Sequence, residues 1–333
     1  MKKLSWLSLS VLLFAGCVTP GGDDEASQVS VATNENSSRF ELFGEFSRPE
    51  EPDGLSGITR TADGRFFAVN DSGGLLHELK FNYDMEGVDG SCEVVRTLAL
   101  PGRKDLEGCA YDPLTGWIWV SDEADTSVNA YDLESGEHKA TLPVPEIYRK
   151  SVRPNNSLES LTISPDGKRL YFANEDTLMI DGDKANREHG GKVRVQEFVR
   201  NDGIEWRLGR QFFYETDPIE GAPFKTYSIS SLADICADER GVLYFLEREL
   251  SVKDGFFPTF RARLYRAQLS EAQNAQTLTK ALVYEENTGF SNYEGLSRLS
   301  EDTTDAAAPV FLLISDGDGP CAKNFALLKH AEN

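Results

Sequence analysis

Three glutamates stand at the same point of a repeated turn-and-strand unit, each directly before a run of apolar residues. They are Glu107, Glu159 and Glu294, and the other two copies of the unit carry Ser56 and Ala233 at that point. Carboxylates and hydroxyls are hard oxygen donors, and calcium accepts the high coordination number that several of them provide. If the fold brings the copies together, we expect Ser56, Glu107, Glu159 and Glu294 to bind one calcium ion. The alternative is a solvated acidic funnel, or carboxylates that cap backbone amides in turns.

The repeated unit also predicts the fold. Its five copies begin at Leu55, Leu106, Leu158, Leu232 and Tyr293. Each copy continues through a polar turn into a second apolar run, at residues 66–70, 117–121, 170–173, 242–246 and 310–315. The steps of 51 to 74 residues between copies suit four-stranded blades with loop insertions, which indicates an all-β protein with the β-propeller architecture. The first strand of each blade lines the axis of a propeller, so the five equivalent positions converge there.

The two ends of the chain predict how the ring closes. Two further β-type runs follow each of the first four copies, whereas the fifth copy is followed by a single run at residues 324–329. An alternating apolar and polar run at residues 39–46 has no partner of its own and can supply the missing strand, which removes an open sheet edge. The sequence therefore predicts five blades closed by an N-terminal strand. Six blades are the alternative, if residues 181–226 contain a further short one.

The N-terminal residues have the pattern of a targeting segment. Lys2 and Lys3 precede an apolar stretch at residues 4–14 and the small residues before Cys17. The stretch resembles the lipobox of bacterial lipoproteins, which implies cleavage before Cys17 and acylation of its thiol; the alternative is an ordinary leader with a chance cysteine. We therefore expect a signal peptide at 1–16, a lipidated flexible tether at 17–38 and a propeller at 39–333. Val18 favours the outer membrane as the location in the cell envelope.

Charge and cysteine content restrict the partners and the redox state. The formal net charge of −21 would repel a phosphate backbone, so nucleic acid is not an expected partner and divalent cations are. Four cysteines remain beyond the leader, at Cys92, Cys109, Cys236 and Cys321. In an oxidising compartment they allow one or two disulfides, or Cys109 and Cys236 are reduced residues of the core. We expect a monomer.

Several other polar residues are weaker candidates. An acid follows each second run, and for most of these acids a hydrogen bond within a turn or between blades is the expected role: Asp71, Asp122, Glu175, Glu247 and Asp316. Ser231 or Asp234 could replace the ligand that is missing at Ala233. The four histidines have no metal-binding spacing and no serine lies in a nucleophile elbow, so a metal-centred hydrolytic site is the chemistry that these residues support.

Taken together, the motifs resemble the phytase-like propeller family, whose members carry the name esterase-like activity of phytase. The resemblance rests on Leu55-Ser56-Gly57-Ile58, Asp105-Leu106-Glu107-Gly108, Asn155-Asn156-Ser157-Leu158-Glu159, Leu246-Glu247-Arg248 and Tyr293-Glu294-Gly295-Leu296. Related SdiA-regulated propellers share the Leu-Ser-Gly and Glu-Gly units. The column of one serine and three glutamates is also similar to the axial site of the calcium-activated apyrases, which implies that these four residues bind calcium; Ala233 departs from that pattern.

Two functions follow from this resemblance. The first is calcium-dependent hydrolysis of a small phosphorylated substrate by a lipid-anchored propeller, with Arg153 and Arg248 as the residues that bind the phosphate. The second is a non-catalytic propeller at the cell surface, in which calcium joins the blades and the rim binds a ligand or an envelope protein. The sequence contains no complete catalytic set that decides between them.

Overall fold

The computed structural model describes residues 39–49, 51–82, 89–201, 203–223, 228–252, 259–269, 272–299, 310–317 and 325–331. The expected signal peptide, tether, Cys17 and Cys321 lie outside these ranges. All the described residues belong to one unit, Ser38–Asn333. None of its described helices is long and apolar enough to cross a membrane.

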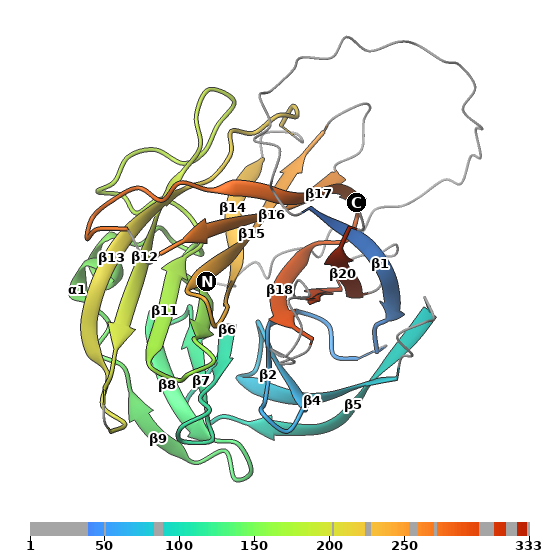
Figure 1. Ribbon diagram of the computed structural model, residues 1–333, viewed down its shortest axis with the longest axis vertical. Helices are drawn as coiled ribbons and strands as arrows, with labels where there is room; N and C mark the ends of the chain where they lie inside the picture. Colours follow the sequence, from blue (N-terminus) through green and yellow to red (C-terminus); the bar gives the residue numbers. More distant parts are fainter. Residues whose placement is uncertain are drawn as a thin grey trace, which may run out of the picture. The chain divides into compact units, whose positions relative to one another are not determined.

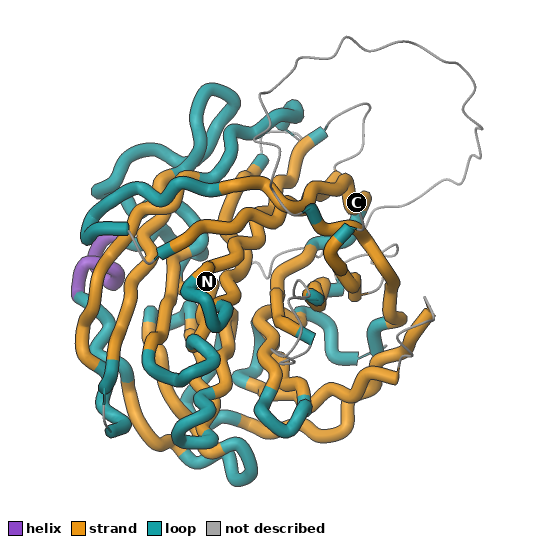
Figure 2. The backbone as a smooth tube through the Cα atoms, in the orientation of Figure 1, coloured by secondary structure: helices purple, strands orange, loops and turns teal. Residues whose placement is uncertain are grey.

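Strands make up nearly all of the regular structure (Figure 2). Three sheets have four strands each, in sequence order. The first contains β6 (Leu106–Tyr111), β7 (Trp117–Asp122), β8 (Ser127–Asp132) and β9 (His138–Thr141). The second contains β10 (Leu158–Ile163), β11 (Arg169–Asn174), β12 (Lys192–Val199) and β13 (Arg207–Glu215). The third contains β14 (Ile229–Ala237), β15 (Val242–Ser251), β16 (Thr259–Gln268) and β17 (Ala281–Gly289).

The fourth sheet is larger and has eight strands. Its spatial order is β18 (Tyr293–Arg298), β19 (Phe311–Ser315), β20 (Phe325–His330), β1 (Phe40–Ser47), β5 (Asp89–Ala99), β4 (Leu75–Asn82), β3 (Phe66–Asn70) and β2 (Leu55–Arg60). β1 pairs antiparallel with β20 and, over three residues, parallel with β5. The parallel pairing fuses two groups of four strands, so the described strands form four sheets rather than five separate ones. β12 and β13, the strands of the region where a sixth blade was considered, belong to the sheet of β10 and β11.

The sheets surround a common centre (Figure 1). The strands β2, β6, β10, β14 and β18 contact one another in a closed cycle, and the later strands of each group lie farther out. Buried apolar side chains form five clusters, each between two neighbouring groups of strands. This is the β-propeller architecture, in which face-to-face packing of the groups provides the core.

One short helix interrupts the strands. α1 (Glu146–Ser151) begins after Pro145 and connects β9 to β10. Proline suits the start of a helix, Glu146 lies at its positive end, and Arg149 and Lys150 lie at its negative end. Its buried Tyr148 packs edge-on against Phe172, with ring centroids 4.9 Å apart, so the helix covers the core between two sheets. The sequence pattern did not predict this helix.

The cysteines that the structure describes are free thiols: Cys92, Cys109 and Cys236 are all buried and unpaired with one another. Of the two alternatives that the sequence left open, reduced core residues are therefore correct for Cys109 and Cys236. Both lie in first strands, where the surrounding sheets exclude solvent.

The pairing of β1 with β20 makes a prediction about stability. Phe46 of β1 is buried and packs against Phe81 with ring centroids 5.3 Å apart, whereas Leu42 of the same strand is 39% exposed. We expect Phe46→Ala to lower the free energy of unfolding by about 3–5 kcal/mol and Leu42→Ala by about 1 kcal/mol or less, measured by denaturant titration. Similar small effects of both substitutions would show that β1 is not an integral part of the fold.

Candidate metal centre

The five equivalent positions predicted from sequence lie at corresponding points of the five central strands. In each pair of first and second strands the register shifts at this point, so that residues of the first strand are left without a partner. A β-bulge of this kind changes the direction of the side chain that it carries. Ser56 and Glu107 meet as predicted: the Ser56 hydroxyl donates a 2.7 Å hydrogen bond to Glu107 Oε2, and both residues are buried.

Close contact between neighbouring central strands determines which type of residue can follow Ser56, Glu107 and Glu294 in the sequence. A Cβ added at Gly57 would lie 2.4 Å from the Glu107 carbonyl oxygen, and one at Gly108 would lie 2.7 Å from that of Glu159. One added at Gly295 would lie 2.5 Å from the Ser56 carbonyl oxygen. The glycines are therefore required because neighbouring first strands approach closely at the axis. This approach holds the carboxylates together.

An arginine supplies positive charge among the acids at this end of the axis. We call these acids the acidic ring: Asp105, Glu107, Glu123, Glu159, Glu175 and Glu294. Arg248, on the second strand β15, donates from Nη2 to Glu159 Oε1 (3.2 Å) and Glu175 Oε1 (2.9 Å), and from Nη1 to Glu294. Its Nε donates to the Ser231 hydroxyl at 3.3 Å. The side chain is only 11% exposed.

This arrangement changes the role that the sequence suggested for the fourth copy. Ala233 provides no ligand there, and Arg248 of the same sheet occupies the space among the acids. Of the two proposed replacements, Ser231 contacts Arg248. Asp234 instead accepts hydrogen bonds from the backbone N–H groups of Ile235 (2.8 Å) and Leu296 (2.8 Å), so it joins β14 to β18 rather than the acidic ring.

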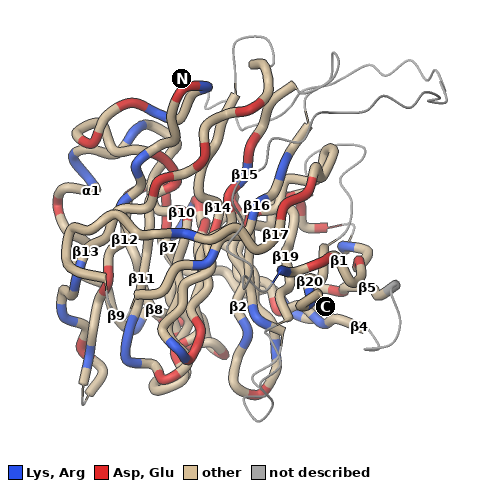
Figure 3. The backbone as a smooth tube through the Cα atoms, turned by 45° about the horizontal axis from the view of Figure 1, so that its top comes forward, with Lys and Arg blue, Asp and Glu red and all other residues tan. Residues whose placement is uncertain are grey.

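Among the residues that the structure describes, two groups of three acids could hold a metal ion. One contains Asp105, Glu107 and Glu123; the other contains Glu123, Glu159 and Glu175. Within each group, one ligand atom of every residue lies within 4.8 Å of the others, and Glu123 belongs to both. The four predicted metal ligands therefore do not form one set: Glu107 and Glu159 fall in different groups, while Glu294 contacts Arg248. Figure 3 shows acidic residues gathered near β10, β14 and β15.

A model of the family described as "Phytase-like: Esterase-like activity of phytase" matches residues 51–319. The chain belongs to the phytase-like family. No curated protein matches it. Solved structures that resemble the phytase-like chain include a streptogramin B lyase, at 11% identity and TM-score 0.37, covering 88% of this chain and 98% of that one. Another is hydrazine synthase of Kuenenia stuttgartiensis, at 13% identity and TM-score 0.40, covering 86% of this chain and 65% of that one. Virginiamycin B lyase from Staphylococcus aureus has 11% identity and TM-score 0.38, covering 88% of this chain and 100% of that one.

Two acids of the candidate metal centre were not predicted, and both have a signal in the sequence. Asp105 lies two residues before Glu107, on the same repeated unit. Glu123 is the neighbour of Asp122, which had been assigned a turn role and does accept hydrogen bonds from the backbone N–H groups of Lys104 (3.1 Å) and Ala124 (3.0 Å). Glu123 instead accepts from Ser157 N at 2.8 Å, on the segment that leads into β10.

The other acids after the second strands have separate roles. Glu175 belongs to the candidate centre, and Asn156 donates a hydrogen bond to it. Glu247 accepts from Tyr214 and from Lys280, each at 2.5 Å, and thereby joins two sheets as expected. Asp316 accepts from Asn292 at 2.8 Å. Asp71 is packed beside Gly54, where a Cβ would lie 2.2 Å from Asp71 Oδ1.

Arg153, one of the two arginines expected to bind phosphate, lies in another set of contacts. Its Nε donates to the Thr177 carbonyl oxygen at 2.8 Å and its Nη2 to that of Gly182 at 2.6 Å. These bonds hold the segment that follows β11. Among the described residues, the hydrogen bonds of Arg153 go to these carbonyl groups, whereas those of Arg248 go to the acids of the acidic ring.

Burial makes these carboxylates hard to ionise. It raises the pKa values of Glu107 and Glu159 well above the ordinary value, and neighbouring carboxylates raise them further. Burial likewise raises the pKa of Glu123 to about 7 and, together with the charge of Asp105, that of Asp71 to about 6. Near neutral pH the candidate metal centre must therefore hold protons or cations.

The raised pKa values predict how stability depends on pH. A carboxyl group whose pKa is higher in the folded than in the unfolded protein stabilises the fold at low pH, and this contribution is lost as the pH rises from about 4.5 to about 7. With a chelator present, we expect the melting temperature to fall across that range. Glu123→Gln should flatten the fall, by roughly 2 kcal/mol of stability at pH 8, while substitution of the exposed Glu188 by Gln should change nothing. A wild-type melting temperature that is constant or rises over this range would contradict the assignment.

Proposed function

We propose that this protein is a calcium-dependent phosphoester hydrolase whose reaction centre is the acidic end of the propeller axis. The observation that carries the proposal is the pair of acid triads that share Glu123, in a chain whose family is described by esterase-like activity of phytase. Arg248 pairs with Glu159, Glu175 and Glu294, and one guanidinium charge does not balance three carboxylates, so a divalent cation would supply the remaining positive charge. Oxygen-only donors favour a hard ion such as calcium.

The chain's own residues suit such a reaction in two ways. Asp105 and Glu107 would hold the ion, with Ser56 orienting the Glu107 carboxylate through its hydrogen bond. Glu123 lies beside both of them, and its carboxylate would accept a proton from an attacking water. When bound, calcium would supply polarisation of a phosphoryl oxygen or of that water.

One specific observation favours a second function. Three carboxylates surround Arg248 and two carbonyl groups engage Arg153, so both arginines expected to bind phosphate already have partners. A non-catalytic propeller needs no phosphate-binding residue. In that case the cation would hold the central strands together, and the rim of the ring would bind a ligand or an envelope protein.

We further propose that the ring has five blades and that β1 closes it. The support is the cycle of contacts among five first strands, the five clusters of buried residues, and the position of β1 between β20 and β5. In this interpretation the eight-stranded sheet is two blades joined through a short parallel pairing. The stability measurement on Phe46 tests the part that β1 plays.

A hydrolysis measurement separates the two functions. The purified protein is assayed against phytate, a nucleotide and an aryl phosphate, with millimolar calcium and with chelator, and its bound metal is measured in parallel. We expect hydrolysis that needs calcium and falls about 100-fold or more in Glu107→Gln, with no change in Glu188→Gln. Bound calcium without hydrolysis would favour the non-catalytic function. A protein that neither binds calcium nor hydrolyses any of the three esters would contradict both.

We also propose that the protein is anchored to the bacterial cell envelope by lipid on Cys17, as a monomer with residues 17–38 as a tether. The support is the leader pattern at residues 2–17. We expect the wild-type protein to enter the detergent phase on phase separation, and Cys17→Ser to leave it uncleaved or soluble. Recovery of wild-type protein in the aqueous phase would exclude the anchor.

A further inference from the structure

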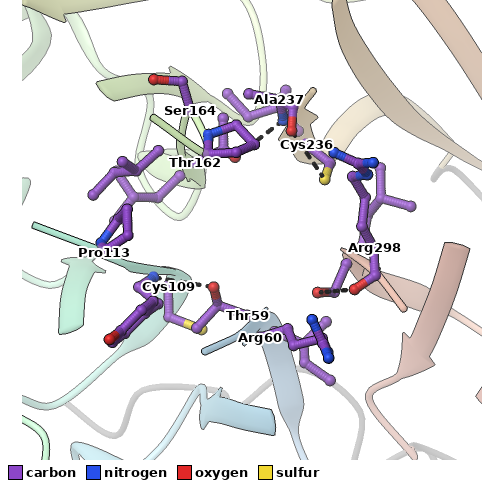
Figure 4. A pocket seen from close by; sticks show the side chains of 17 residues that line it. Thr59, Arg60, Cys109, Pro113, Thr162, Ser164, Cys236, Ala237 and Arg298 are labelled. Atoms are coloured by element: carbon purple, nitrogen blue, oxygen red, sulfur yellow. Dashed lines mark hydrogen bonds between the residues drawn. The ribbon is translucent and has the colours of Figure 1, made fainter. Parts of the chain in front are cut away.

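The opposite end of the axis contains a cavity of about 100 Å³ that the metal centre does not use (Figure 4). Residues from all five central strands line it. In each central strand, the residue four positions after the equivalent position of the repeated unit (Ser56, Glu107, Glu159, Ala233 or Glu294) lines the cavity. These residues form a second ring: Arg60, Tyr111, Ile163, Ala237 and Arg298. Four residues of a strand span about 13 Å, so this ring and the acidic ring lie at separate ends of the same strands.

The charged side chains among the described residues that line this cavity are two arginines. Arg60 and Arg298 come from β2 and β18, which are neighbours in the cycle, and no Asp or Glu is among the lining residues. This contrasts with a chain of net charge −21. Two buried thiols, Cys109 and Cys236, also line the cavity, and burial raises the pKa of Cys236 to about 12 and that of Cys109 as well. They therefore add no negative charge.

The lining also contains a buried hydrogen-bond donor that is left unpaired. Arg298 donates from Nη1 to Glu239, but its Nε is buried without a hydrogen-bond partner among the described residues. A buried donor that stays unpaired destabilises the fold, and a bound acceptor removes that cost. The hydroxyls of Thr59 and Thr162 accept from the backbone N–H groups of Tyr111 (3.0 Å) and Ala237 (3.1 Å), and a hydroxyl that accepts a hydrogen bond can also donate one.

We propose that this cavity binds a small oxyanion, either a carboxylate or a phosphate group. The guanidinium groups of Arg298 and Arg60 provide the charge, and the threonine hydroxyls provide further donors. Ile163, Ala237 and Tyr111 form the rest of the ring, so a short apolar group attached to the anion can be accommodated. The cavity volume of about 100 Å³ suits one small group. This site is independent of the proposed hydrolysis, because the metal centre lies at the other end of the axis.

The test is calorimetric titration of the purified full-length protein with inorganic phosphate and, separately, with propionate. Chelator is present throughout, so that a cation at the acidic end cannot bind the anion. We expect at least one of the two anions to bind with a dissociation constant of about 1 mM or below. The stronger of the two identifies the chemical class, because phosphate offers three or more acceptors and propionate offers two acceptors with an apolar group.

Variants assign the binding to the cavity. Arg298→Gln and Arg60→Gln should each weaken binding by about tenfold or more, since each removes a charge-assisted donor. Arg240→Gln is the matched control, because this nearby arginine is 62% exposed and pairs with Asp238 outside the cavity. Melting temperatures confirm that each variant is folded, and Arg298→Lys replaces Arg298→Gln if the latter unfolds. Absence of binding up to about 10 mM, or equal weakening in Arg240→Gln, would overturn the proposal.

Discussion

The structure depends on balancing like charges that the fold forces together at the axis. Central strands that contact one another in a cycle bring equivalent side chains close, and bulges turn those side chains inward. At a separation of about 6 Å and an effective dielectric constant of about 20, two carboxylates repel by roughly 3 kcal/mol. Several such pairs would cost a large part of the stability of an ordinary domain. The acids must therefore be protonated or paired with cations.

Arg248 is the part of this balance that the protein itself supplies. It comes from the sheet whose first strand has alanine in place of an acid, and it bonds to carboxylates of two other sheets, at Glu159, Glu175 and Glu294. A tethered guanidinium carries one charge and a fixed direction, and its described hydrogen bonds reach Glu159, Glu175 and Glu294. One guanidinium charge cannot balance all the carboxylates of this end, so a divalent cation at the triads that share Glu123 would complete the balance.

Much of the fold and of the candidate site could be predicted from the sequence, because residues at the same point of a repeated unit take equivalent places in the structure. The recurrence of Glu107, Glu159 and Glu294 before apolar runs predicted both the propeller and the convergence of these residues on the axis. The partners of each acid could not be predicted in the same way. Asp122 ends β7 and Glu123 follows it, and which of the two joins the candidate centre depends on the backbone N–H groups that each one meets in the fold. The reach of Arg248 depends on how neighbouring sheets pack. The parallel pairing of β1 with β5 involves too few residues to leave a pattern.

The two ends of the axis differ in chemistry although the same strands build them. The strand positions of Glu107 and Glu294 at one end correspond to those of Tyr111 and Arg298 at the other, four residues along. The backbone provides one set of positions, and the side chains make one end suitable for cations and the other for anions. Function therefore has to be argued from each site rather than from the fold, which many unrelated activities share.

The central claim is that Arg248 and a divalent cation neutralise the same group of acids. Calorimetric titration of calcium into the wild-type protein and into Arg248→Met tests it most directly. Removing the arginine leaves Glu159, Glu175 and Glu294 without their counter-charge, so we expect tighter calcium binding and a larger rise in melting temperature on adding calcium than in the wild type. Calcium affinity that is unchanged or lost in Arg248→Met, in a protein that remains folded, would contradict the account.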